Sequence, residues 1–129
     1  MGFKRRSNEL EDKIMSHPVT VINWTSDANC VPCKNQERDL AEIGDVVDTD
    51  AVGIMNLNFQ KNRREFSKMG NKLLPSINVF VRGKQMDFID TKLKIPGQKG
   101  FKNKPVKSLA GARSKSTLTH VIRSALEKL

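Results

Sequence analysis

The two cysteines of the chain, Cys30 and Cys33, are the residues whose type and spacing best suit chemistry. Asn29 precedes the pair, and Val31 and Pro32 lie between the two thiols. Residues three apart on a helix are neighbours on its surface, so these thiols can form a disulfide. This arrangement fits a cycle in which one cysteine attacks a substrate disulfide and the second releases the product.

A metal site and an inert pair are the two other interpretations of this spacing. A structural zinc site takes four ligands, usually from a second cysteine pair or a close histidine pair. Only His17 and His120 remain in this chain, far apart in the sequence. Two inert buried cysteines would fit an isolated pair, but a position between a strand and a helix favours reactivity. We therefore expect neither a metal nor a cofactor.

The elements around the cysteines explain why the first one is expected to be reactive. Residues 19–24 are apolar and β-branched, which predicts a buried strand. From Val31 the pattern becomes helical, with one apolar stripe that continues through Gly44 to Val47. Cys30 thus precedes a helix, whose free amides and positive dipole end stabilise a thiolate. Pro32 fits the first turn of that helix because no amide is needed there.

The rest of the chain alternates between helical and extended patterns. Ser7 and Ser116 are the predicted N-caps of the first and last helices, and Gly83 allows the hairpin turn. The further predicted elements are helices at residues 7–17, 62–71 and 116–129, a strand at 51–59, a hairpin at 76–90 and a returning strand at 106–111. We expect a single α/β domain over residues 1–129, with a mixed sheet of about four strands and helices on both faces.

The composition is that of an ordinary folded protein, with 37% apolar and 29% charged residues. No segment approaches the roughly 18 to 20 apolar residues that cross a bilayer. The basic start of the chain has no apolar run after it, so we expect no secretory signal and a cytoplasmic location. A cytoplasm keeps thiols reduced, which favours a catalytic role for two cysteines over a structural one.

Positive charge is concentrated in one segment. Residues 1–90 hold 13 basic and 13 acidic residues, whereas residues 91–116 hold eight basic residues and no acidic one. Residues 91–105 lack any period and are predicted to be an inserted basic loop. The segment is either a solvated surface or a docking site for an acidic protein or nucleic acid. Its six candidate docking lysines are Lys92, Lys94, Lys99, Lys102, Lys104 and Lys107.

Four segments in order resemble the thioredoxin family. They are residues 30–34 (CVPCK), 56–62 (NLNFQKN), 68–84 (KMGNKLLPSINVFVRGK) and 110–122 (AGARSKSTLTHVI). The resemblance covers about residues 19–90 and 106–129, and it implies a thioredoxin-like fold. It also implies an oxidoreductase of electron transport that reduces protein disulfides, with Cys30 as nucleophile and Cys33 as resolving thiol. Its partners would be disulfide-containing proteins and a reductase such as thioredoxin reductase. The competing hypothesis is a binding module of the same fold that acts through residues 91–116.

The resemblance also implies a substrate platform. Pro75 would be a cis-proline beside the disulfide, and Leu74 would offer backbone groups to an extended substrate. Asn29, Val31 and Pro32 would complete the surface around the cysteines. Asn29 stands where the family has tryptophan, and Val31 replaces a glycine, so the redox potential does not follow from the resemblance.

Three further differences from the family concern the interior. The family's buried carboxylate has no match, because its place falls at Ile22 or Trp24. Its lysine partner is replaced by Asn56, and Asp27 is either a substitute acting through water or a solvated loop residue. The family's first strand is missing, because residues 1–17 have room for one helix and little else.

Overall fold

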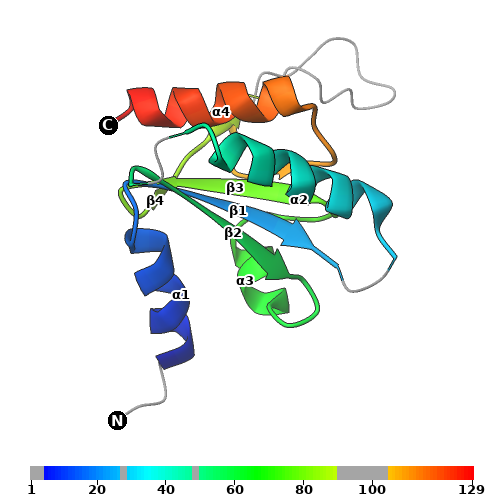
Figure 1. The fold of residues 1–129 in the computed structure, drawn as a ribbon. Coiled ribbons are helices and arrows are strands. Elements are labelled where there is room, and N and C mark those ends of the chain that lie inside the picture. The colour runs from blue at the N-terminus through cyan, green and yellow to red at the C-terminus, as the bar shows by residue number, and fades with distance from the viewer. Residues whose placement is uncertain (1–4, 27–28, 48–49, 90–104) are drawn as a thin grey trace.

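A five-stranded sheet with helices on both faces forms the centre of the molecule (Figure 1). The computed structural model describes residues 5–26, 29–47, 50–89 and 105–129. Along the chain the elements are α1 (Arg5–Met15), β1 (Val19–Thr25), α2 (Val31–Gly44), β2 (Val52–Asn58), α3 (Arg63–Lys68), β3 (Ser76–Val81), β4 (Lys84–Gln85), β5 (Phe88–Ile89), β6 (Pro105–Val106), β7 (Leu109–Ala110) and α4 (Lys115–Glu127). The predicted α/β class and mixed sheet are confirmed.

The strand order of the sheet is β2-β1-β3-β4, and β7 pairs with β3 as well. β1 and β2 are parallel because helix α2 crosses over between them. β3 runs antiparallel to β1, with Ser76 opposite Trp24. The end of β1 and the start of β3 therefore lie side by side, where the strands end. The chain enters α2 from this end of the sheet.

Two apolar cores lie on opposite faces of the sheet, because successive side chains of a strand point to opposite faces. On β1, Val19 and Val21 belong to the first core, whereas Ile22 and Trp24 belong to the second. Helices α2 and α4 cover the first core, and α1 and α3 cover the second (Figure 1). The predicted placement of helices on both faces is thus confirmed.

The helix ends differ from the predicted ones. Helix α1 begins at Arg5, so Ser7 lies inside the helix and the prediction of Ser7 as N-cap is wrong. Helix α4 is capped by Ser114, whose hydroxyl accepts a hydrogen bond from the Thr117 amide at 3.2 Å. Ser116, the predicted cap, lies one residue inside the helix. Either serine would suit a cap by type, and the position where the chain leaves β7 decides between them.

Helix α2 ends earlier than the apolar stripe indicated. Its last residue is Gly44, and the amide of Asp45 closes the helix on Ala41 and Glu42. Val47 lies beyond the helix but still packs against the first core. An apolar period thus shows which residues are buried without showing where the helix stops.

The hairpin after β3 turns where the glycine predicted it. Arg82 and Gly83 both have positive φ, at 52° and 79°, as a two-residue turn of this hand requires. The second strand of the hairpin, β4, is shorter than predicted, because β7 occupies the part of the β3 edge next to Ile77. The returning strand predicted at residues 106–111 contains β7, which is only two residues long. Met86 follows β4, and the chain then leaves to pair β5 with β6 in a separate sheet. Pro105 belongs to β6 rather than to a loop.

Buried amides tie the second core to the segment that leads into β7. The Trp24 indole donates to the Asn78 side-chain oxygen at 2.7 Å. The Asn78 amide group donates to the carbonyl oxygens of Met69 and Lys107. These bonds hold the loop before β3 and the start of β7 against the same strand. Among the described residues, no helix is both long and apolar enough to cross a bilayer.

Candidate redox site

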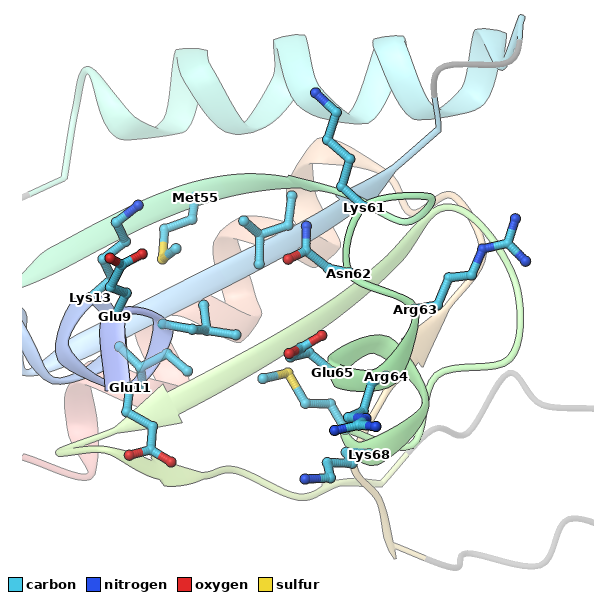
Figure 2. Close-up of a pocket in the computed structure, with 14 residues that line it drawn as sticks. Glu9, Glu11, Lys13, Met55, Lys61, Asn62, Arg63, Arg64, Glu65 and Lys68 are labelled. Carbon is cyan, nitrogen blue, oxygen red and sulfur yellow. The ribbon is translucent and has the colours of Figure 1, made fainter. Parts of the chain in front are cut away.

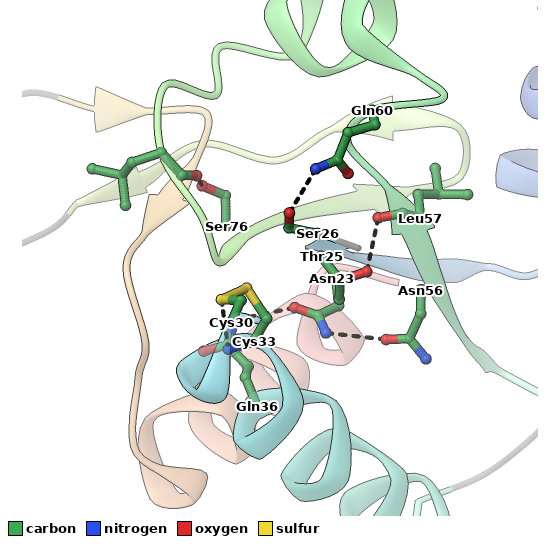
Figure 3. The surroundings of a disulfide bond; sticks show 11 residues. Asn23, Thr25, Ser26, Cys30, Cys33, Gln36, Asn56, Leu57, Gln60 and Ser76 are labelled. Carbon is green, nitrogen blue, oxygen red and sulfur yellow. Dashed lines mark hydrogen bonds between the residues drawn. A yellow bond between two sulfur atoms is a disulfide. The ribbon is translucent and has the colours of Figure 1, made fainter. Parts of the chain in front are cut away.

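Cys30 is the N-cap residue of helix α2 (Figure 3). Its sulfur accepts a hydrogen bond from the backbone amide of Cys33 at 3.2 Å. Its carbonyl oxygen accepts from the amide of Lys34, also at 3.2 Å. The sulfur therefore faces the free amides and the positive dipole end of the helix. Pro32 lies in the first turn, where it removes no helical hydrogen bond.

Cys30 and Cys33 form a disulfide with a Cα–Cα distance of 5.3 Å. The two sulfurs differ in exposure: Cys33 is only 1% exposed, whereas Cys30 is half-buried. The neighbouring Asn29, Val31 and Pro32 are all exposed. An external thiol or disulfide can therefore reach Cys30, whereas Cys33 is shielded from solvent.

Leu74 and Pro75 lie directly before β3, at the end of the sheet where β1 ends. The peptide bond between them is cis. Pro75 is buried, and its carbonyl oxygen accepts a hydrogen bond from the Gly111 amide at 2.8 Å. Leu74 is half-buried, and within the described part of the chain its backbone makes no hydrogen bond. Ser76, which follows Pro75, belongs to the surroundings of the disulfide (Figure 3).

A chain of uncharged amides lies beneath the disulfide (Figure 3). Gln36, one turn after Cys33, is 1% exposed and donates to the Asn23 side-chain oxygen at 3.1 Å. Asn23, on β1, donates to the side-chain oxygen of Asn56 on β2 at 3.0 Å. The Gln36 oxygen accepts from the backbone amide of Arg113 at 2.9 Å. All these groups are neutral, so none of them can accept a proton at ordinary pH.

Sequence reasoning missed Asn23 and Gln36, although both left a signal. Asn23 interrupts a buried apolar strand, and Gln36 lies in the stripe of α2 that also buries Cys33, Leu40 and Ile43. A polar residue in an apolar stripe needs a buried partner. The partners are found only once α2 is packed on the sheet.

Three solved thioredoxins share this arrangement of helices and strands. A mutant thioredoxin from Halobacterium salinarum matches with a TM-score of 0.68 and 19% identity, over 92% of this chain and 83% of that one. Thioredoxin from Malassezia sympodialis matches with 0.66 and 19%, over 92% and 86%. Oxidised thioredoxin from Plasmodium falciparum matches with 0.63 and 18%, over 91% and 89%. The chain has the thioredoxin fold. No protein-family model and no curated protein sequence matches it.

The prediction that the family's buried carboxylate would correspond to Ile22 or Trp24 is wrong, because neither residue faces helix α2. Ile22 and Trp24 point into the second core, on the face of the sheet opposite α2. Asn23 points toward α2 and lies beside Asn56 in the strand register. The position that faces the cysteine helix is therefore filled by a neutral amide. Asp27 lies outside the described residues.

The basic segment is described only in part. Lys107 is exposed, and docking through this segment remains a prediction. Lys115 has a counter-charge, because its ammonium donates to the Glu42 carboxylate at 2.6 Å. That hydrogen bond lowers the pKa of Glu42 and raises the pKa of Lys115. Lys115, one of the eight basic residues of 91–116, is thus neutralised by an acidic residue from outside the segment. Of the six candidate docking lysines, the five outside the described residues are Lys92, Lys94, Lys99, Lys102 and Lys104.

Proposed function

We propose that this protein is a thiol-disulfide oxidoreductase that reduces disulfides of other proteins. One observation carries the proposal: a disulfide between Cys30 and Cys33 at the start of α2, with the Cys33 amide donating to the Cys30 sulfur. The thioredoxin fold around it supports the same activity. Cys30, the more exposed sulfur, is the nucleophile, and Cys33 is the resolving thiol.

The reaction consists of two exchanges of sulfur–sulfur bonds. The Cys30 thiolate attacks one sulfur of the substrate disulfide, forms a mixed disulfide and releases the other substrate sulfur as a thiolate. Cys33 then loses its proton and attacks the Cys30 sulfur, which forms the internal disulfide and releases the second substrate sulfur. Two electrons pass from the protein to the substrate. A dithiol of a reductase returns them by the reverse exchanges.

Among the described residues, no buried carboxylate is present to accept the proton of Cys33. Asn23 and Gln36 are the buried polar groups that lie beneath the disulfide, and neither ionises at ordinary pH. We propose that the departing substrate thiolate or water takes this proton.

The surface around Cys30 supports the binding of an extended substrate. Within the described residues the backbone amide and carbonyl of Leu74 have no partner, and Pro75 lies directly before β3. Asn29, Val31 and Pro32 are exposed beside the disulfide and would contact the same substrate. A reducing direction fits a cytoplasmic setting, where a thiol pool keeps cysteines reduced.

Reduction of insulin by dithiothreitol, followed as turbidity, tests the proposal. The wild-type protein should accelerate the reaction, and Cys30→Ser should leave it at the uncatalysed rate because no nucleophile remains. Cys33→Ser should instead accumulate a mixed disulfide with insulin, visible on a non-reducing gel. A Cys30→Ser protein as active as wild type would disprove the proposed mechanism.

A further inference from the structure

A second surface lies on the opposite face of the sheet from α2, between α1 and α3 (Figure 2). It is a groove of about 840 Å³. Its apolar floor comes from two elements and the end of α3: Leu10 and Ile14 of α1, Met55 and Leu57 of β2, and Met69 at the end of α3. Neither cysteine nor any residue of the substrate platform lines it. The groove is therefore separate from the candidate redox site.

The groove is continuous with an open edge of the sheet. β2 is the end strand, and within the described residues only β1 pairs with it. Its seven residues include no charge and no proline, the usual devices that protect an edge from pairing. Met55 and Leu57 belong both to this strand and to the groove floor. A strand added beside β2 would therefore place every second side chain over the groove.

The wall of the groove formed by α3 and the preceding turn is basic. Lys61, Arg63, Arg64 and Lys68 are all exposed there, with Glu65 as the one acidic residue of that wall. Within the described chain none of these cations has an ion pair. Figure 2 shows them gathered at one end of the groove, and the acidic residues of α1 at the other. This end of the groove therefore attracts negative charge.

We propose that β2 and the groove dock an extended segment of a partner protein that is acidic at one end and apolar along the rest. The backbone of the segment pairs with the β2 edge. Its apolar side chains fill the floor over Met55 and Leu57, and its carboxylates lie against Arg64 and Lys68. This inference is independent of the thiol chemistry, because it uses no residue of the redox site.

Labelled peptides test the proposal by fluorescence anisotropy. The first probe is a ten-residue peptide with three glutamates followed by alternating valine and serine, and the second has the reverse order. Two further peptides have the same two sequences with lysine in place of each glutamate. One glutamate peptide should bind, and its lysine counterpart should bind at least about tenfold more weakly, because the wall repels it. Equal affinities for the two would overturn the proposal.

Methylation of the peptide amides tests whether pairing with the β2 edge occurs. Alternate amides of an added strand point toward β2, and the others point to solvent. Methyl groups on one alternate set should abolish binding, and methyl groups on the other set should leave it unchanged. Retained binding by both methylated peptides would disprove strand addition.

Two double variants test which charges matter. Arg64→Glu with Lys68→Glu should weaken binding of the glutamate peptide by about tenfold or more. Arg123→Glu with Lys128→Glu makes the same charge change at exposed positions of the α4 side and should have no effect. Far-UV circular dichroism should show both variants folded. Equal losses in both variants would overturn the assignment of the α3 wall.

The other occupants of this surface would give different results. If a second copy of this chain occupies it, ultracentrifugation should show a dimer that Met55→Glu converts to a monomer, without peptide binding. If nucleic acid occupies it, a ten-nucleotide single strand should bind through Arg64 and Lys68 while the glutamate peptide does not. Either result would overturn the proposal of an acidic protein segment.

Discussion

Asn23 determines the polarity of the interior beneath the disulfide. It is fully buried, and its side chain joins Gln36 of the cysteine helix to Asn56 of β2. A neutral amide can satisfy both partners without the cost of a buried charge. The disulfide therefore lies over uncharged amide side chains.

A change of Asn23→Asp should make stability fall as pH rises. Burial raises the pKa of the new carboxyl above the value of about 3.9 that it has in an unfolded chain. Between the two pKa values the folded state keeps a proton that the unfolded state has released, so the free energy of unfolding decreases with pH. Urea midpoints at pH 4 and pH 8 measure the effect.

The matched control is Asn56→Asp, since the Asn56 side chain is exposed and its carboxyl would titrate much as it does in the unfolded chain. It should show the wild-type pH profile. Identical profiles for Asn23→Asp and wild type would show that position 23 is not in a low-dielectric interior.

Among the elements, helix α4 illustrates how one hydrogen bond positions a large apolar face. Leu118, Val121, Ile122 and Ala125 bury that face in the first core. The Ser114 hydroxyl begins the helix by accepting a hydrogen bond from the Thr117 amide. That amide would otherwise lack a partner.

Replacement of Ser114→Ala should lower the free energy of unfolding by about 1 kcal/mol, the usual cost of losing an N-cap. Urea denaturation measures it. Ser116→Ala provides the comparison, because Ser116 is exposed and its hydroxyl contacts the Ser114 hydroxyl rather than a free backbone amide of the helix. Its effect should be close to zero. Equal losses for the two variants would contradict the assignment of Ser114 as the cap.

At the scale of the whole molecule, the two cores share one sheet. β1 and β3 each contribute side chains to both cores, so loss of either core removes support from the other. Trp24 is the single tryptophan of the chain and lies in the second core. Its fluorescence therefore reports on the face of the sheet away from α4.

The variant Leu118→Ala should shift both probes of unfolding together. It removes a side chain that is 1% exposed in the first core, which costs about 2–5 kcal/mol. Because the cores unfold as one unit, urea midpoints from Trp24 fluorescence and far-UV circular dichroism should fall equally. Val46→Ala, at an 83% exposed position, should shift neither. A Trp24 transition that stays at the wild-type midpoint would show independent cores.

The features that short-range physics controls could be predicted from the sequence. The strand before Cys30, the helix after it and the turn at Gly83 follow from neighbouring residues: apolar alternation, the free amides of a helix start and a glycine that accepts positive φ. The resemblance to thioredoxins adds the overall fold. Together they placed the cysteine pair at the start of α2.

Only the tertiary structure decided which buried side chains meet, how long the later strands are and where the groove lies. Asn23 meets Asn56 because β1 and β2 pair in one register, and a shift of β2 by one residue would turn Asn56 to the other face. β4 is short because β7, far along the chain, takes part of the β3 edge. The groove exists because α1 and α3 pack apart on one face of the sheet, and its β2 side is open because no described strand pairs with the outer edge of β2. Each of these depends on contacts between distant segments, which local sequence patterns do not encode.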